Sequence, residues 1–456
     1  MKKIITFTLC LFCLTTLFTQ SAEKELKFYE QEAANAEKKQ FLIAIDYDLD
    51  SWLERNYALP SASKAMLLKA EVEYKAKQYT AAYLTLLKYA YEFPNEKMPK
   101  DLVGKLMEEF PTKQQAELTR ALAPKNLPQI TEDRLNAYFS AANQLELKNA
   151  QDYLLKDYTL FFTRFPAYEN KDKIELLLGD TYRNSGNYLA ALAKYDKVWQ
   201  IYPSTKYKAA SLRMKGDIYA SELKDRQLAR EYYKRVLKDF PNSVEVPTVY
   251  KHLALLEEDE KNYASAVEYA QQAHEGYLKD GQKLAAFEAL MFKAEVQEKD
   301  LKNYNSAVET LKAAAEIMPA QEQYYVEAKQ KEAQIQAKKL KDNYSERSVM
   351  EEIAVRFPKT ENGAQALYRV AELTEDFGEL KSAKDKYNRV ILNRPQSKMA
   401  VKAQKRIKAI ERAEAKTAKE SAKTGQPQSK TVAKPAQQVT EETTEQIEES
   451  IAKIED

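Results

Sequence analysis

Small, aromatic and apolar residues recur along this chain at spacings that predict pairs of antiparallel helices. The clearest unit, Lys173 to Pro203, carries them at Gly179, Tyr182, Gly186, Tyr188, Ala191, Tyr195 and Pro203. Gly179 is small where one helix must approach a neighbour closely, and Tyr182 fills the gap beside it. Gly186 permits a left-handed turn between two helices, because glycine adopts positive φ without steric cost. Ala191 and Tyr195 lie one turn apart on the second helix, which Pro203 ends.

The same pattern returns in other segments and extends the prediction to most of the chain. The matching residues are Ala70, Tyr79, Ala82, Leu86 and Pro94; Gly216, Tyr219, Ala229, Tyr233 and Pro241; Ala254, Tyr263, Ala266 and Ala273; Ala294, Tyr304, Ala307, Leu311, Ala314 and Pro319; and Ala371, Gly378, Leu380, Ala383, Tyr387 and Pro395. Segments 99–124, 131–166 and 322–358 keep the length but lose the small residues, so we expect looser helical pairs there. Self-similarity at about 34–39 residues is typical of stacked helical pairs.

This order of residue types resembles the tetratricopeptide repeat (TPR). The second helices end in aromatic-proline steps such as Phe93-Pro94, Phe165-Pro166 and Phe240-Pro241, and Phe-Pro-Asn-Ser at 240–243 is similar to repeats of exported bacterial TPR proteins. Those proteins include periplasmic components of outer-membrane β-barrel assembly and of Tol-Pal coordination. HEAT and armadillo repeats share the longer period but do not explain the Gly-Tyr-Gly-Tyr-Ala-Tyr-Pro order. The resemblance implies a right-handed, all-α TPR-like solenoid of about ten helical pairs that binds proteins.

The first 22 residues read as a secretory signal. Lys2 and Lys3 precede an apolar run from Ile4 to Phe18, and Ser21-Ala22 predicts cleavage after Ala22. An uncleaved N-terminal anchor is the alternative. Both cysteines, Cys10 and Cys13, lie inside this segment, and neither follows the small residue that a lipoprotein site requires. We therefore expect an exported, periplasmic protein that is not a lipoprotein and whose mature chain has no cysteine.

Four further regions follow from composition and pattern. We predict divergent helical repeats over 23–166, TPR-like repeats over 167–397, a capping helix over 398–414 with Val401, Ile407 and Ile410 inward, and a disordered charged tail over 415–456. Within the tail, Ile447, Ile451 and Ile454 would share one helical face. That face is either a peptide that docks on a partner or a short helix without a role.

Composition excludes several function classes. Lys and Arg number 71 against 69 Asp and Glu, so the basic surplus that a general nucleic-acid binder needs is missing. Only two histidines, His252 and His274, are present, and no phosphate-binding loop or hydrolase motif occurs. We expect no cofactor, no metal, no catalytic residue and no small-molecule substrate.

A binding site, if present, is expected on the concave face, which first-helix residues line in TPR arrays. The positions that correspond are Asp180, Arg183, Asn184, Arg213, Asp217, Lys251, Glu258, Glu295, Glu298, Tyr368, Glu372, Glu375 and Asp376. This face would change from mixed charge to acidic toward the C-terminus. Asp180 and Asp217 stand where the peptide-carboxylate clamp of chaperone-binding TPRs needs Asn, which argues against that use.

The sequence thus predicts a non-enzymatic protein-interaction scaffold of the bacterial cell envelope. Its partners would be other envelope proteins or peptides, and it would reach a membrane only through them or through an uncleaved signal. Two alternatives stay open: an enzyme-accessory protein or wall-associated hydrolase with activity in the divergent N-terminal repeats, and a membrane-tethered assembly subunit.

Overall fold

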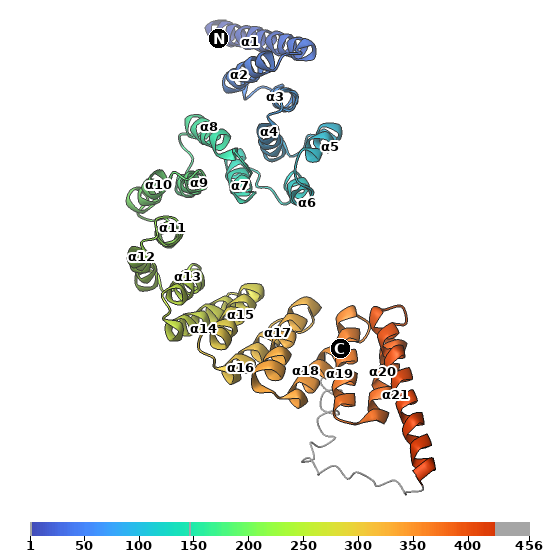
Figure 1. Ribbon diagram of the computed structural model, residues 1–456. Helices are drawn as coiled ribbons and strands as arrows, with labels where there is room; N and C mark the ends of the chain where they lie inside the picture. Colours follow the sequence, from blue (N-terminus) through green and yellow to red (C-terminus); the bar gives the residue numbers. More distant parts are fainter. Residues whose placement is uncertain (1, 146, 425–456) are drawn as a thin grey trace. The chain divides into compact units, whose positions relative to one another are not determined.

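In a computed structural model, the described chain consists of helices and connecting turns (Figure 1). The structure describes residues 2–145 and 147–424, with side chains from residue 19 to residue 420 apart from residue 146. No strand occurs among these residues. The chain divides into two compact units, Met1–Leu301 and Lys302–Asp456, which are described separately below.

The first unit begins with eight helices in the region predicted to hold the signal and the divergent repeats. They are α1 (Lys2–Asn35), α2 (Lys39–Asn56), α3 (Ala62–Lys75), α4 (Tyr79–Glu92), α5 (Lys100–Glu108), α6 (Thr112–Ala121), α7 (Thr131–Gln144) and α8 (Ala150–Arg164). Seven more complete it: α9 (Lys171–Asn184), α10 (Tyr188–Ile201), α11 (Lys208–Ser221), α12 (Arg226–Asp239), α13 (Val246–Asp259), α14 (Tyr263–Lys279) and α15 (Lys283–Lys299).

The second unit continues the succession of helices. Its elements are α16 (Tyr304–Ala315), α17 (Glu322–Ile335), the π-helical turn η1 (Gln336–Leu340), α18 (Asn343–Arg356), α19 (Glu361–Asp376), α20 (Leu380–Asn393) and α21 (Lys398–Thr424). Helices α18 and α19 pack together, as do α19 and α20, and α20 and α21.

Tight turns between helices have one residue in the left-handed region, followed by a polar residue that precedes the next helix. Gly186 and Gly378 occupy this position with φ of +77° and +81°. Lysines occupy it at other turns, with φ between +53° and +63°, at Lys77, Lys224, Lys261, Lys302 and Lys341. The side chain of the next residue often caps the helix: Asn187 accepts from the amide of Ala190 at 3.2 Å. Lysine is therefore accepted where the sequence pattern had suggested glycine alone, since a single left-handed residue is a modest cost.

Several second helices end immediately before the aromatic-proline steps. Phe93, Phe165, Phe240 and Phe357 follow the last residues of α4, α8, α12 and α18, and each has left the helical conformation. The residue before proline is driven out of the α region by the proline ring, which explains why these helices stop there.

Glycine in the first helix of two hairpins makes room for a tyrosine from the second. A Cβ atom on Gly179 would lie 2.4 Å from Cε1 of Tyr195, and one on Gly216 would lie 2.5 Å from Cε1 of Tyr233. Both rings are almost fully buried. The alanines one turn before them, Ala191 and Ala229, are completely buried, as are Ala307 and Ala383 at the corresponding positions of later hairpins.

The region before residue 166 stacks less regularly than the repeat pattern suggests. Helices α5 and α6 are only nine and ten residues long. Helix α4 packs directly on α7 and α8, and the apolar core here is continuous from α3 to α9. The short α5–α6 pair therefore does not separate its neighbours as a regular repeat would.

The two ends of the chain differ from expectation in detail. Helix α21 extends to Thr424, ten residues past the boundary predicted at 414, because Ala, Lys and Glu in 415–420 are strong helix formers. Val401, predicted to point inward, is 54% exposed, whereas Ala400, Ala403 and Ile410 are buried. Residues 425–456, with most of the predicted disordered tail, lie outside the described part.

The end of the predicted signal is part of the first helical layer. Ala22 is buried, and its carbonyl oxygen accepts a hydrogen bond from Nε1 of Trp52 at 3.0 Å. The side chains of residues 1–18, with most of the predicted signal, lie outside the described part. No helix is long and apolar enough to cross a membrane within residues 19–145 and 147–420, whose side chains the structure describes.

Candidate protein-binding face

The first helices α9, α11, α13 and α15 carry many of the predicted site residues of the first unit. Two of these residues, the half-buried Asp180 and the buried Asp217, are acceptors for the repeat tyrosines: Tyr195 donates to Asp180 at 2.7 Å, and Tyr233 donates to Asp217 at 2.8 Å. The carboxylates therefore hold the second helix of each hairpin against the first.

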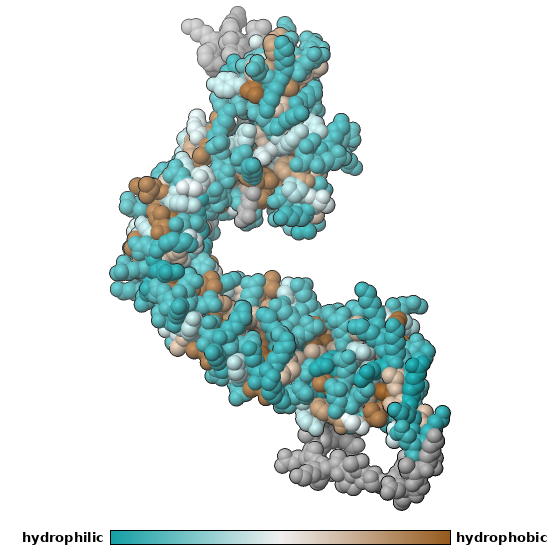
Figure 2. Space-filling view, in the orientation of Figure 1, coloured by the Kyte–Doolittle hydropathy of each residue, from teal (hydrophilic) through white to brown (hydrophobic). Residues whose placement is uncertain are grey.

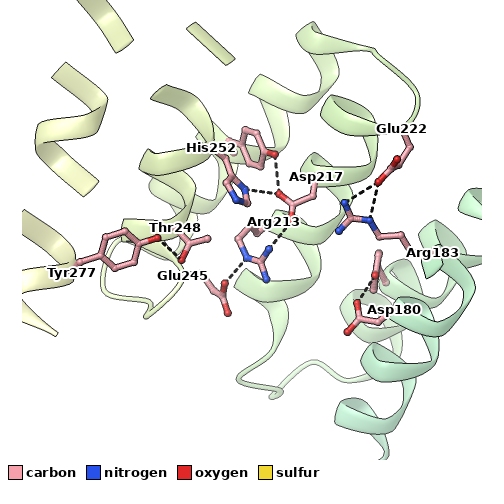
Figure 3. Close-up of polar contacts among 11 residues, drawn as sticks. Asp180, Arg183, Arg213, Asp217, Glu222, Glu245, Thr248, His252 and Tyr277 are labelled. Atoms are coloured by element: carbon pink, nitrogen blue, oxygen red, sulfur yellow. Dashed lines mark hydrogen bonds and ion pairs between the residues drawn. The ribbon is translucent and has the colours of Figure 1, made fainter. Parts of the chain in front are cut away.

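Asp217 is the centre of a larger cluster. Figure 3 shows His252 of α13 and Arg213 of α11 directed at its two oxygens, with Nδ1 of His252 2.7 Å from Oδ1. Arg213 also donates through Nε to Glu245, which precedes α13, at 2.5 Å. The cluster thus joins two successive first helices, α11 and α13.

The environments of the two aspartates differ, and their pKa values diverge accordingly. Burial raises the pKa of Asp180 to about 6, against the opposing influence of Tyr195 and Arg213. Burial acts on Asp217 in the same direction, but His252 and Arg213 outweigh it and lower the pKa of Asp217. Asp217 is therefore a stable anion, while Asp180 is close to protonation in mildly acid solution.

Two further ion pairs join successive first helices. Arg183 of α9 contacts Glu222 at the end of α11 at 3.0 Å, and Lys251 of α13 contacts Glu288 of α15 at 3.2 Å (the former in Figure 3). Predicted site residues from Asp180 to Lys251 are thus largely engaged within the protein; Asn184 is exposed. Their pairing aligns the repeats and reduces the charge offered to a partner.

The ends of α13 and α15 differ, because carboxylates outnumber cations there. The pKa of Glu258 is raised, first by partial burial and then by the negative charges of Asp300, Glu295 and Asp259. Lys299 pairs with Glu295 and acts in the opposite direction on the pKa of Glu258. We call Glu258, Glu295, Glu298 and Asp300 the acidic cluster. Lys299 compensates only part of this negative charge, and the carboxylates repel one another.

In the second unit, the predicted site residues are mostly structural. Glu375 accepts from the hydroxyl of Tyr387 at 3.0 Å and from Nε of Arg406 at 2.8 Å, so it ties α19 to α20 and α21. Glu372 pairs with Arg369 at 3.4 Å, and Tyr368 packs against the ring of Tyr387. Asp376 is exposed.

Sequence reasoning identified one member of most of these pairs and missed the other. Glu222 and Glu245 lie in or beside turns, and neither they nor His252 belong to the positions counted for the face. A signal did exist, since each partner follows its mate by 32 to 39 residues, about one repeat length. No three His, Cys, Asp or Glu side chains among those described are arranged to hold a metal ion.

Comparison with known proteins identifies one segment by sequence. The tetratricopeptide repeat family profile matches residues 208–243, which contain α11 and α12. A comparison with curated proteins found no match. The predicted fold class, an all-α TPR-like solenoid, is confirmed by this match together with the helical-hairpin repeats of the structure.

Solved structures of TPR proteins are similar to parts of the chain at low identity. PilW, a type IV pilus biogenesis factor, is 17% identical over 51% of this chain and 97% of its own, with a TM-score of 0.29. The C-terminal part of a TPR protein from Cytophaga hutchinsonii is 15% identical over 58% and 98%, with a TM-score of 0.37. The P58(IPK) TPR domain is 12% identical over 86% and 99%, with a TM-score of 0.26.

Proposed function

We propose that this chain is a non-enzymatic protein-interaction scaffold that binds a basic partner segment at the acidic cluster of α13 and α15. The observation that carries the proposal is the contrast along the first-helix face. On α9 and α11, the charges are paired between repeats, whereas Glu258 is surrounded by further carboxylates. A face on which like charges outnumber their partners attracts and orients a molecule of the opposite charge.

The surface of the protein supports recognition by charge. Figure 2 shows a visible face covered mainly by hydrophilic residues, with hydrophobic residues in small separate patches. The two most exposed apolar side chains, Leu189 of α10 and Leu392 of α20, belong to different units. Scattered apolar residues are normal on a protein surface and do not define a docking site.

The cellular place of the scaffold is the second part of the proposal. The charged start, the short apolar run and Ser21-Ala22 support export to the periplasm and a role in envelope or outer-membrane assembly. Ala22 is the last residue of the predicted signal, so cleavage would remove the carbonyl oxygen that Trp52 binds. N-terminal sequencing of the native protein is expected to begin at Glu23, and an intact Met1 would favour a tethered form.

Charge reversal tests the binding face. The full chain with Glu258→Lys, Glu295→Lys and Glu298→Lys is expected to lose partners that the wild type captures from envelope extracts. The matched control reverses Glu268 and Glu275, which are exposed on the neighbouring second helix α14. Both variants should melt as the wild type does, since exposed charges contribute little to stability. Equal capture by the two variants would refute the acidic cluster as the binding surface.

A further inference from the structure

A cavity of about 680 Å³ lies among α2, α3, α4 and α8, in the divergent part of the first unit. Its walls combine apolar side chains, including Leu53, Met66, Leu84 and Leu160, with a surplus of charged ones. The lining contains six carboxylates and five cations. This composition differs from the aromatic and aliphatic packing of the neighbouring core.

The charges cluster around one lysine of α3. Nζ of Lys69 contacts Oε1 of Glu73 at 2.8 Å and Oδ1 of Asp50 at 3.3 Å, and it also pairs with Asp46. Lys156 of α8 pairs with Asp50 from the opposite wall. Three carboxylates therefore share two ammonium groups, and the cluster is one positive charge short of neutrality when all three carboxylates are ionised.

One oxygen of this cluster has no donor in hydrogen-bond geometry, although the hydroxyl of Thr85 lies close enough to Glu73 to lower its pKa. Glu73 is 1% exposed and lines the cavity, and its Oε2 atom is buried without a donor, while Oε1 is bound to Lys69. A buried carboxylate oxygen that lacks a donor is costly, so such atoms are normally satisfied by protein, water or a ligand.

We propose that this cavity is a binding site for an alkylammonium group, whose charge is neutralised by Glu73 and whose carbon stem lies against Leu84 and Leu160. The group supplies the missing positive charge and the missing hydrogen-bond donor together. Its source is either a free primary amine or a lysine side chain of a protein, and the two differ in what surrounds the stem. This site is separate from the acidic cluster, and the inference does not rest on the proposed function.

The charge state of Glu73 adds a second signature. Burial raises the pKa of Glu73 to about 7, against the lowering influence of Lys69 of α3 and Thr85 of α4. Asp46 of α2 acts in the raising direction, and Tyr153 and Lys156 face the cluster from α8. An ammonium ion competes with the proton on this carboxyl group, so binding should strengthen as Glu73 ionises.

The test measures binding of n-pentylamine to the full chain by calorimetry and ligand-observed NMR, with 1-pentanol as the neutral analogue. We expect the amine to bind and to bind more weakly at about pH 6 than at about pH 8, since Glu73 ionises between these values. Glu73→Gln should weaken it about tenfold or more and abolish the pH dependence. Glu71→Gln, on an exposed position of the same helix, is the matched control and should bind as the wild type does.

Two further experiments distinguish a free amine from a protein lysine and control for misfolding of the variants. Binding of acetyl-Gly-Lys-Gly-amide is compared with binding of its norleucine analogue. If the lysine peptide binds and n-pentylamine does not, the site is assigned to a protein lysine. Leu160→Trp fills the cavity from a half-buried position and should remove binding while Glu73 stays intact. Failure of both amines to bind, equal binding of pentanol, or full binding by the Glu73→Gln variant would overturn the proposal.

Discussion

The contact between Gly179 and Tyr195 gives a sharp prediction for Gly179→Ala. The new Cβ atom would lie 2.4 Å from Cε1 and 2.8 Å from Cδ1 of Tyr195, about 1 Å short of a normal carbon contact. The ring is fully buried and its hydroxyl is bound to Asp180 at 2.7 Å, so it cannot move without weakening that hydrogen bond.

The magnitude follows from three opposing effects. Overpacking costs about 1–3 kcal/mol, and a weakened hydrogen bond to a charged group costs about 1.5–3 kcal/mol. Replacing glycine inside a helix returns about 1 kcal/mol. The free energy of unfolding should therefore fall by about 1.5–5 kcal/mol, given the sum of these terms. Gly216→Ala should behave alike, because its Cβ would lie 2.5 Å from Tyr233.

Urea unfolding followed by circular dichroism measures the change, with Gly104→Ala as the control. Gly104 also lies inside a helix, but a Cβ atom there would meet nothing within 4 Å. The control should be neutral or slightly stabilised. Hydrogen exchange should show the loss of protection centred on α9 and α10, since repeats couple mainly to their neighbours. If Gly179→Ala and Gly104→Ala shift the midpoint alike, the proposed tyrosine–glycine contact is wrong.

Three other outcomes are expected. Ala191→Leu and Ala307→Leu, at fully buried positions, should each destabilise the fold by about 1–3 kcal/mol and broaden the thermal melt, and an unchanged melt would contradict their burial. Asp180 has a folded pKa of about 6 against an ordinary 3.8, so the folded state binds the extra proton and this group makes stability fall as pH rises through that interval. Asp180→Asn should remove this contribution. The urea midpoints measured below and above this pH interval should therefore differ less in the variant than in the wild type. Arg183→Gln should cost under about 1 kcal/mol, because its pair with Glu222 is partly exposed, and a larger loss in urea unfolding would show that the pair is buried in solution.

Local residue patterns were sufficient to predict the helical hairpins. Glycine at 186 and 378, alanine at 191 and 307, and the aromatic-proline steps act within a few residues of where they stand, through backbone sterics and side-chain size. The same turns built on lysine, such as Lys261, escaped prediction because lysine has no special preference for positive φ. Their signal lies in the residue that follows: after Lys302 this is Asn303, whose side chain accepts from the amide of Ser306.

The pairing of charges was beyond the reach of the sequence. Asp217 is one predicted site residue among many until the rotation between successive hairpins brings His252 against it. Likewise, the cavity around Glu73 exists because α4 packs on α8, past the short α5–α6 pair. Residue type and period determine that helices form and stack, since those depend on neighbours along the chain. Which carboxylate is satisfied and which is left without a partner depends on the angle and separation between helices many residues apart, and only the tertiary structure sets these.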